Sequence, residues 1–315
     1  MERETAFERS DWALFVFVAA TWGSSFLFID IGVDHFAPAV VALLRLAFGA
    51  ATLAAAPAAR RSVPRSAWPA IALLGVVWMA APFVLFGVAQ QSIDSSLAGM
   101  LNAAAPLFTA VVAALLARRL PTRRRRAGLL IGFLGVLAIS WPSLAGAHAT
   151  AAGASLVIAA TMLYGVAFNI AGPLQQSHGA LPVIWRAQLV AIGLVAPMGI
   201  ATLSASTFAW SSLAAVAALG SLGTALAFVA FATLAGRVGS TRASVTVYFL
   251  PAVAIALGAL LRDETIAAVS LVGTVLVTAG AYIVSRSELG TARPGPVVAT
   301  QPPGAASRHP AATRD

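Results

Sequence analysis

The stretch that decides the fold is Arg118-Arg119-Leu120-Pro121-Thr122-Arg123-Arg124-Arg125-Arg126. An uncharged apolar run lies on each side of it, residues 97–117 before and 127–141 after. A bilayer core about 30 Å thick is crossed by ~20 apolar residues in helical form, so these runs predict two membrane-spanning helices. Pro121 cannot continue a helix and marks the connection between them. Because Arg-rich loops stay on the cytoplasmic side, the connection is expected inside the cell.

The composition extends this reading to the whole chain of 315 residues. Hydrophobic residues make up 59% and charged residues only 10%, and the mean hydropathy is +0.88, which excludes an ordinary soluble domain. The net charge of +9 consists of Arg in loops, so it predicts no nucleic-acid partner. The absence of Cys excludes disulfides and thiolate metal sites, and nothing in the chain predicts a metal or a cofactor.

Apolar runs separated by Pro, Gly or charge predict an all-α membrane protein with ten transmembrane helices. Each must be helical because lipid cannot satisfy an exposed backbone. Residues 1–11 lack the basic segment of a cleaved signal peptide, so the first helix is expected to be retained, and residues 287–315 are expected to be a disordered tail. The predicted helices are 12–33, 38–57, 68–90, 95–117, 127–142, 151–172, 182–203, 210–235, 241–261 and 266–285.

The distribution of Arg predicts the orientation of these helices. With the N-terminus inside, seventeen of the twenty basic residues fall in cytoplasmic segments, and only Arg262 falls in an outer loop. The other two, Arg45 and Arg186, lie within helices. Both termini are therefore expected to be cytoplasmic.

An internal repeat divides the chain into two halves, 12–142 and 151–286. A shift of 145 residues aligns Pro106 with Pro251 and Gly128 with Gly273, and it also aligns several Phe and Ser residues. Five helices per half is an odd number, so the second half is expected to enter the membrane from the opposite side. Inverted repeats of this kind are typical of secondary transporters. The two prolines fall in mid-helix, where each allows a kink that could serve gating or simple packing.

The motif Trp22-Gly23-Ser24-Ser25-Phe26 resembles the opening motif of the EamA-type drug/metabolite transporters, and the repeat through Pro251, Glu264 and Gly273 resembles their second unit. The chain departs from the family in having Arg119 at the position equivalent to Glu264. The resemblance implies a ten-helix inner-membrane carrier whose central cavity is lined by the first, third, fourth, sixth, eighth and ninth helices. Such carriers move amino acids, other metabolites or drugs, often outward.

Candidate substrate-binding residues are polar or aromatic side chains expected near mid-membrane. Trp22 and its repeat partner Tyr164 suit an amphiphilic small molecule, although both could instead be packing residues. Asn102, Asn169, Tyr248 and Thr224 could contact the substrate or could only hydrogen-bond between helices.

Arg45 is the most unusual residue because a charge within a membrane helix is costly unless it is paired. An ion pair with Asp30 near the outer end of the first helix is the favoured prediction, and contact with a substrate anion is the alternative.

These observations favour a secondary carrier that moves a small-molecule substrate across the lipid bilayer, as a monomer or a homodimer. No P-loop is present to suggest ATP drive. An enzyme is not expected, because the four His lie in loops or the tail without ligand spacing. A channel or a structural membrane protein is the other alternative, although no rings of charge predict a water-filled pore.

Overall fold

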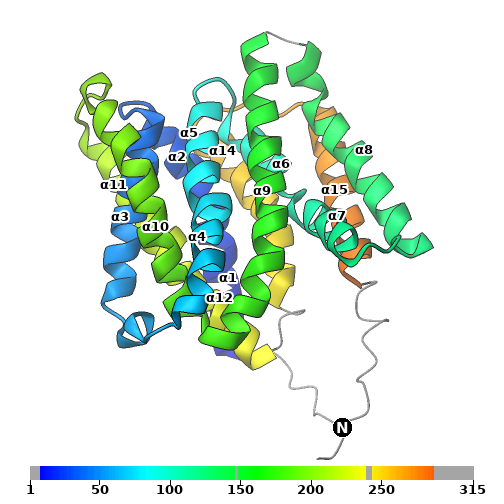
Figure 1. Ribbon diagram of the computed structural model, residues 1–315. Helices are drawn as coiled ribbons and strands as arrows, with labels where there is room; N and C mark the ends of the chain where they lie inside the picture. The colour runs from blue at the N-terminus through cyan, green and yellow to red at the C-terminus, as the bar shows by residue number, and fades with distance from the viewer. Residues whose placement is uncertain (1–7, 146–147, 239–242, 287–315) are drawn as a thin grey trace, which may run out of the picture.

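The computed structural model describes residues 8–145, 148–238 and 243–286, and these ranges contain helices and no strand (Figure 1). The predicted tail 287–315 and residues 1–7 lie outside the described residues. The helices are α1 Arg9–Gly23, α2 Ser25–Val33, α3 Pro38–Ala54, η1 Pro57–Arg60, η2 Arg65–Ala67, α4 Trp68–Leu74, η3 Gly75–Ala80, α5 Ala81–Ala89, α6 Ser95–Asn102, α7 Ala105–Ala117, α8 Arg123–Ala145, α9 His148–His178, α10 Ala180–Ala201, η4 Leu203–Ala205, α11 Trp210–Ala218, η5 Leu219–Leu226, α12 Ala227–Val238, η6 Ser244–Phe249, α14 Leu250–Leu261 and α15 Ala268–Arg286.

Eight helical segments of the described chain are long and apolar enough to cross a membrane. They are Arg9–Val33, Arg65–Ala89, Ser95–Ala117, Thr150–His178, Ala180–Ala201, Trp210–Val238, Ser244–Leu261 and Ala268–Ser285. α3 is apolar but has only 17 residues, and α8 has 23 residues that begin with four Arg. The all-helical membrane fold is confirmed, and the crossing of the membrane by α3 and α8 stays a prediction.

The fourth and ninth predicted helices are interrupted. Ala103 and Ala104 separate α6 from α7, and the 3-10 segment η6 precedes α14. Pro106 and Pro251 lie in the first turns of α7 and α14, where a missing N–H costs no helical hydrogen bond. Each proline therefore lies just after an interruption of its predicted helix, at the start of the following helical segment.

The two π-helical segments, η3 and η5, occupy equivalent places in the two halves. A shift of 145 residues in the sequence aligns Gly75 of η3 with Gly220 of η5. A methyl group added at Gly75 would lie 2.8 Å from the carbonyl oxygen of Ala187, and one added at Gly220 would lie 2.5 Å from that of Arg45. π-Helical turns are frequent at functional sites. Here each one rests directly on the backbone of a neighbouring helix, α10 or α3.

Glycines bring α8 and α15 into backbone contact. A methyl group added at Gly135 would lie 2.6 Å from the carbonyl oxygen of Gly273, and one added at Gly280 would lie 2.5 Å from that of Gly128. Because Gly128 faces Gly280 and Gly135 faces Gly273, the two helices run antiparallel, and they lie side by side in Figure 1. Small residues at such positions are how membrane helices approach closely.

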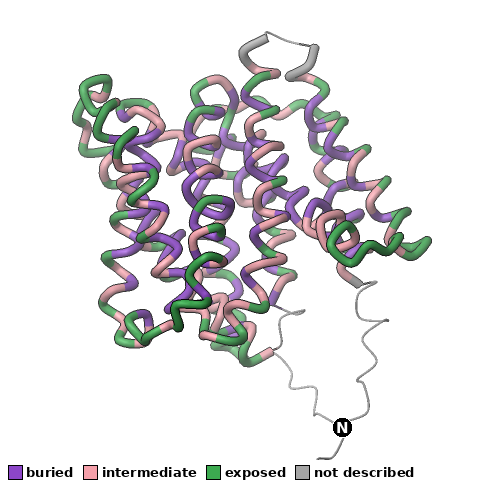
Figure 2. Tube along the Cα trace, in the orientation of Figure 1, coloured by how far each residue is buried: buried purple, intermediate pink, exposed green. Residues whose placement is uncertain are grey.

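Buried residues concentrate between the helices, and exposed residues lie on the outer surface (Figure 2). Many exposed residues are apolar: Leu115 and its repeat partner Leu260 are 70% and 76% exposed, as expected for a surface that faces lipid. Trp side chains at membrane–water interfaces form belts. Four exposed Trp residues lie at or near helix ends, namely Trp12, Trp68, Trp141 and Trp210.

We predict that Gly135→Ala destabilises the protein, because the added methyl group would overlap backbone atoms of α15 that cannot rotate away. Overpacking of this kind costs about 1–3 kcal/mol. The measurement is the denaturation midpoint of the purified protein in detergent.

Gly193→Ala in α10 is the matched control, since a methyl group there would have no neighbouring atom within 4 Å. Ala is favoured over Gly within a helix, so this variant should keep or slightly gain stability. An equal loss in both variants would contradict the assigned role of the α8–α15 contact.

Candidate functional site

Aromatic rings from α1, η3, α5, α9 and α12 form a continuous series between the helices. The centroids of neighbouring rings lie 5.0 to 6.1 Å apart, which is the range of favourable edge and tilted ring contacts. We call this series the aromatic cluster; its members, in order of contact, are Trp22, Phe228, Trp78, Phe168, Tyr164 and Phe86.

The two predicted aromatic candidates both belong to this cluster. The indole N–H of Trp22 donates to the carbonyl oxygen of Gly223, at 3.0 Å, so Trp22 ties α1 to the π-helical segment η5. Tyr164 lies between the rings of Phe86 and Phe168. Its hydroxyl has no hydrogen-bond partner among the described residues. Trp22 therefore has a structural bond to η5, whereas the hydroxyl of Tyr164 could bond to a ligand.

Arg45 lies next to the aromatic cluster with only 9% of its surface exposed. Its Nε donates to Thr224 Oγ1, at 2.9 Å, and its guanidinium carbon lies 3.6 Å from the centre of the Phe83 ring. The two terminal amino groups of Arg45 have no partner among the described residues. One edge of the guanidinium is thus held by a hydroxyl and one face by a ring, while the fork of amino groups is left open.

The predicted ion pair between Arg45 and Asp30 was wrong. Asp30 accepts from Nε of Arg262, and no described carboxylate pairs with Arg45. The reason is depth: Arg45 lies seven residues beyond Pro38, the first residue of α3, which is about 10 Å along the helix at 1.5 Å per residue. Asp30 instead lies beside the connection that carries Arg262.

Gln188 of α10 completes the polar surroundings of Arg45, although it was not predicted as a site residue. A methyl group added at Gly49, one turn beyond Arg45, would lie 3.2 Å from Gln188 Nε2 and 3.4 Å from Thr224 Cβ. Gln188 is fully buried, and both polar atoms of its side chain lack a described partner. An amide within an apolar helix was the signal in the sequence that could have identified it. We call Arg45, Thr224, Gln188 and Tyr164 the polar cluster.

The remaining predicted residues lie in different environments. Asn169 donates to the carbonyl oxygens of Thr109 and Gly165, at 3.0 and 2.8 Å, and so joins α9 to α7. Asn102, at the end of α6, is buried, and its Oδ1 has no described partner. The structure therefore places Thr224 and Tyr164 near Arg45 and bonds Trp22 to Gly223, the neighbour of Thr224 in the chain. It gives Asn169 a bond between helices.

Tyr248 belongs to a separate feature on the outside of the bundle. Its hydroxyl is 2.8 Å from Ser285 Oγ, and its ring borders a hollow of about 530 Å³ between α14 and α15. A second, apolar hollow of about 320 Å³ lies where η3 and α5 meet α10. Neither hollow includes a residue of the polar cluster. Within the described ranges, no group of His, Asp and Glu is arranged to hold a metal ion.

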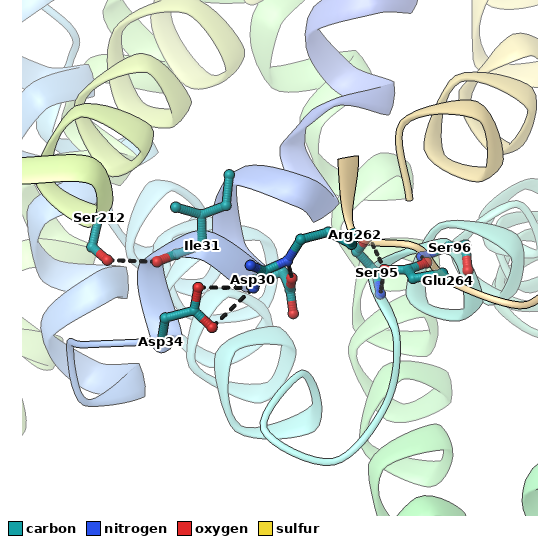
Figure 3. A network of polar contacts seen from close by, with 8 residues as sticks. All are labelled: Asp30, Ile31, Asp34, Ser95, Ser96, Ser212, Arg262 and Glu264. Atoms are coloured by element: carbon teal, nitrogen blue, oxygen red, sulfur yellow. Dashed lines mark hydrogen bonds and ion pairs between the residues drawn. The ribbon is translucent and has the colours of Figure 1, made fainter. Parts of the chain in front are cut away.

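An ionic network lies at one end of the bundle, where α2 meets the connection between α14 and α15 (Figure 3). Arg262 binds Asp30 through Nε and both carboxylate oxygens of Asp34 through a terminal amino group, the latter at 2.9 Å. The hydrogen bonds with Asp34 and Asp30 outweigh burial and raise the pKa of Arg262, so its charge is retained. We call this the outer network, after the predicted orientation.

Glu264 extends the outer network to α6. Its carboxylate accepts from the backbone N–H groups of Ser95 and Ser96, at 2.9 Å each, and from the Ser95 hydroxyl, at 2.7 Å (Figure 3). A carboxylate at the N-terminus of a helix satisfies free N–H groups and interacts favourably with the helix dipole. This partner was missed because Glu264 and Ser95 are far apart in sequence. The equivalent contact of Arg119 would involve Ser240, which lies outside the described residues.

A second ion pair lies at the opposite end of the α1–α2 pair. Arg237, in the last turn of α12, is 3.3 Å from Asp11 Oδ1 and 3.1 Å from Ser10 Oγ. Asp11 is buried in the first turn of α1. The segment α1–α2 is therefore joined to the second half of the chain by ion pairs at both ends, with the aromatic and polar clusters between them.

We predict that Thr224→Val destabilises the protein, because Val removes the only oxygen among the described residues that accepts from the buried guanidinium of Arg45. A buried donor left without a partner costs about 1–3 kcal/mol. Thr224→Ser keeps the hydroxyl and should retain most of the stability. The measurement is the denaturation midpoint in detergent.

Thr233→Val provides a control with the same chemical change. Thr233 is exposed, and its hydroxyl donates only to a carbonyl oxygen of its own helix. If Thr233→Val lowered the midpoint as much as Thr224→Val, the bond to Arg45 would not be the cause.

Comparisons with known proteins agree with this architecture. The model of the EamA-like transporter family matches residues 11–141 and again residues 151–286. A probable terminal-alkyne amino-acid exporter of Streptantibioticus cattleyicolor is 30% identical over 288 residues, which cover 90% of this chain and 95% of that protein. A probable amino-acid metabolite efflux pump of Escherichia coli is 29% identical over 297 residues, covering 87% and 94%.

A solved crystal structure supports the fold independently of sequence. It shares 16% identity with this chain and has a TM-score of 0.61, and the match covers 88% of this chain and 98% of that one. The two family matches span most of the chain and confirm the resemblance of the Trp22 motif and the Pro251 repeat. The chain therefore belongs to the EamA-like transporter family of the drug/metabolite transporter superfamily, as a multi-pass membrane transporter and not an enzyme.

Proposed function

We propose that this protein exports amino acids or their close derivatives across the bacterial inner membrane by alternating access. The single observation that carries the proposal is the attachment of α1–α2 to the second half at both ends, with an aromatic and polar centre between the two attachments. A carrier needs a closure on each side of its substrate, and the relatives named as exporters or efflux pumps favour the outward direction.

The two halves, 12–142 and 151–286, are proposed to be inverted repeats of five helices each. The antiparallel contact of α8 with α15, the paired π-helical segments and the paired helix breaks before Pro106 and Pro251 all support this arrangement. Two halves related in this way can exchange inward-open and outward-open states by adopting each other's conformation.

The orientation is proposed from the Arg distribution, with both termini in the cytoplasm. The outer network of Arg262 and Glu264 then closes the external side, and the pair of Arg237 with Asp11 holds the cytoplasmic end of α1. Each open state requires the contacts at one end to separate while those at the other end persist.

We expect the purified protein in liposomes to catalyse saturable counterflow of amino acids with apolar side chains. Phenylalanine, methionine and propargylglycine are suitable labelled substrates, the last being a terminal-alkyne amino acid. Trp22→Ala removes one wall of the aromatic cluster and its bond to Gly223, so transport efficiency should fall about tenfold or more, which corresponds to ~1.4 kcal/mol.

Trp210→Ala is the matched control, since Trp210 is 75% exposed at the start of α11 and lies outside the cluster. It should transport as the parent protein does. Absence of counterflow for every member of the panel, from a protein that remains folded, would refute the proposed function.

We further expect Arg262→Gln to open the outer side. The chain contains no Cys, so a single Ser25→Cys can report access to the segment between Trp22 and Asp30 without background. Ser25 is buried, and its reaction with an impermeant maleimide added from outside should rise about tenfold for a shift of ~1.4 kcal/mol towards the open state.

Arg237→Gln breaks the pair at the other end and should not raise labelling from outside. Single Cys variants at the exposed positions Ser204 and Ser62 identify the two sides, with Ser204 reacting in intact cells and Ser62 only after permeabilisation. The reverse pattern would overturn the proposed orientation, and unchanged Ser25→Cys labelling would overturn the role of Arg262 as a closure.

A further inference from the structure

We propose that the polar cluster around Arg45 is a carboxylate-binding subsite, and that the aromatic cluster beside it receives the apolar side chain of the same substrate. The inference rests on the proposed function as an amino-acid exporter and names the group that recognises the amino acid. The substrate class is then α-amino acids with an apolar or aromatic side chain and a free carboxylate.

The geometry of Arg45 leaves one direction open for a ligand. Nε is engaged by Thr224 at 2.9 Å, and one face of the guanidinium is covered by Phe83 at 3.6 Å. These two contacts hold the plane of the group and leave the terminal amino groups unbonded among the described residues. Two parallel N–H groups of a guanidinium match the two oxygens of a carboxylate.

No carboxylate of the described residues pairs with Arg45. The described carboxylates in ion pairs serve other cations, with Asp30 and Asp34 on Arg262 and Asp11 on Arg237. A cation that is 91% buried in a membrane protein is costly unless an anion or water reaches it, so a substrate carboxylate would remove an existing penalty. Binding therefore favours an anionic group strongly over a neutral one.

Neutral donors reinforce the same position. The side-chain amide of Gln188 is fully buried, and neither of its polar atoms has a partner among the described residues. It lies against Gly49 together with Thr224. Tyr164 lies within electrostatic range of Arg45 and has a hydroxyl without a described hydrogen-bond partner. Unsatisfied buried polar groups are rare in folded proteins, and several around one cation indicate a missing ligand.

The repeat shows that packing alone does not require Arg45. The Arg45 carbonyl contacts Gly220 in the same way that the Ala187 carbonyl contacts Gly75, so Ala187 is the counterpart of Arg45 in the second half. Ala187 is buried and packs with no charge. A cation needed for the scaffold would be expected in both halves, whereas a cation that binds a substrate is needed once.

The test compares each amino acid with its carboxamide in the proteoliposome counterflow assay. Labelled phenylalanine is the transported probe, and unlabelled phenylalanine or phenylalaninamide is the competitor. In the parent protein the amide, which lacks the carboxylate, should compete about tenfold or more weakly. In Arg45→Gln this discrimination should disappear, and in Arg45→Lys part of it should remain, because Lys keeps the charge without the bidentate fork.

Arg186→Gln is the matched control. Arg186 is another Arg within a membrane-spanning segment, but it donates to the backbone carbonyls of Ala59 and Pro182, so its loss should leave the discrimination intact. Equal competition by acid and amide in the parent protein would overturn the carboxylate subsite and leave the export function standing. That comparison needs no variant, so it decides the matter even if Arg45→Gln does not fold. Failure of the parent protein to transport any amino acid would instead refute the proposed function.

Discussion

The structure depends on the inability of hydrocarbon to accept or donate a hydrogen bond. Every polar group in the bilayer core must find a partner inside the protein, so helices dominate and each departure from a regular helix needs support from a neighbour. The π-helical segments pack directly against neighbouring backbones, with Gly75 on α10 and Gly220 on α3. The helix breaks lie just before Pro106 and Pro251. Each proline then stands in the first turn of a helix, where its missing N–H costs no hydrogen bond. Against this background, the groups without a described partner are few, and Gln188 beside Arg45 is one of them, with Asn102 and Gln90 elsewhere in the bundle.

Charged side chains are distributed unevenly along the bundle, and their distribution suits a carrier. Charges at the two ends are paired, through Arg262 on one side and Arg237 on the other. These pairs are partly exposed, so the cost of separating them is moderated by water. The charge of Arg45 in the middle is buried, and no described carboxylate pairs with it. In the proposed carrier, ion pairs that can separate suit the two ends, where the substrate would enter and leave. A cation without a described counter-ion, such as Arg45, suits the place where a carboxylate would bind.

The two halves share packing contacts but differ in their charged residues. Glycine contacts between α8 and α15, and the paired π-helical segments, repeat at equivalent positions because both halves solve the same packing problem. The differences carry chemistry: Arg45 has Ala187 as its counterpart, and Glu264, which binds the start of α6, has Arg119. In the carrier proposed above, one substrate needs one carboxylate-binding site, and two identical closures would not distinguish the two sides of the membrane.

The sequence by itself determined the membrane class, the helical content and the family, because hydropathy and local motifs depend on neighbours in the chain. The sequence did not determine which side chains form contacts with each other. Only the tertiary structure decided that Asp30 binds Arg262 and that Arg45 binds Thr224, since these partners lie more than 170 residues apart in sequence. An apolar helix offers many faces with similar composition. Which face meets which neighbour is settled by close backbone packing, and that packing is a property of the assembled bundle.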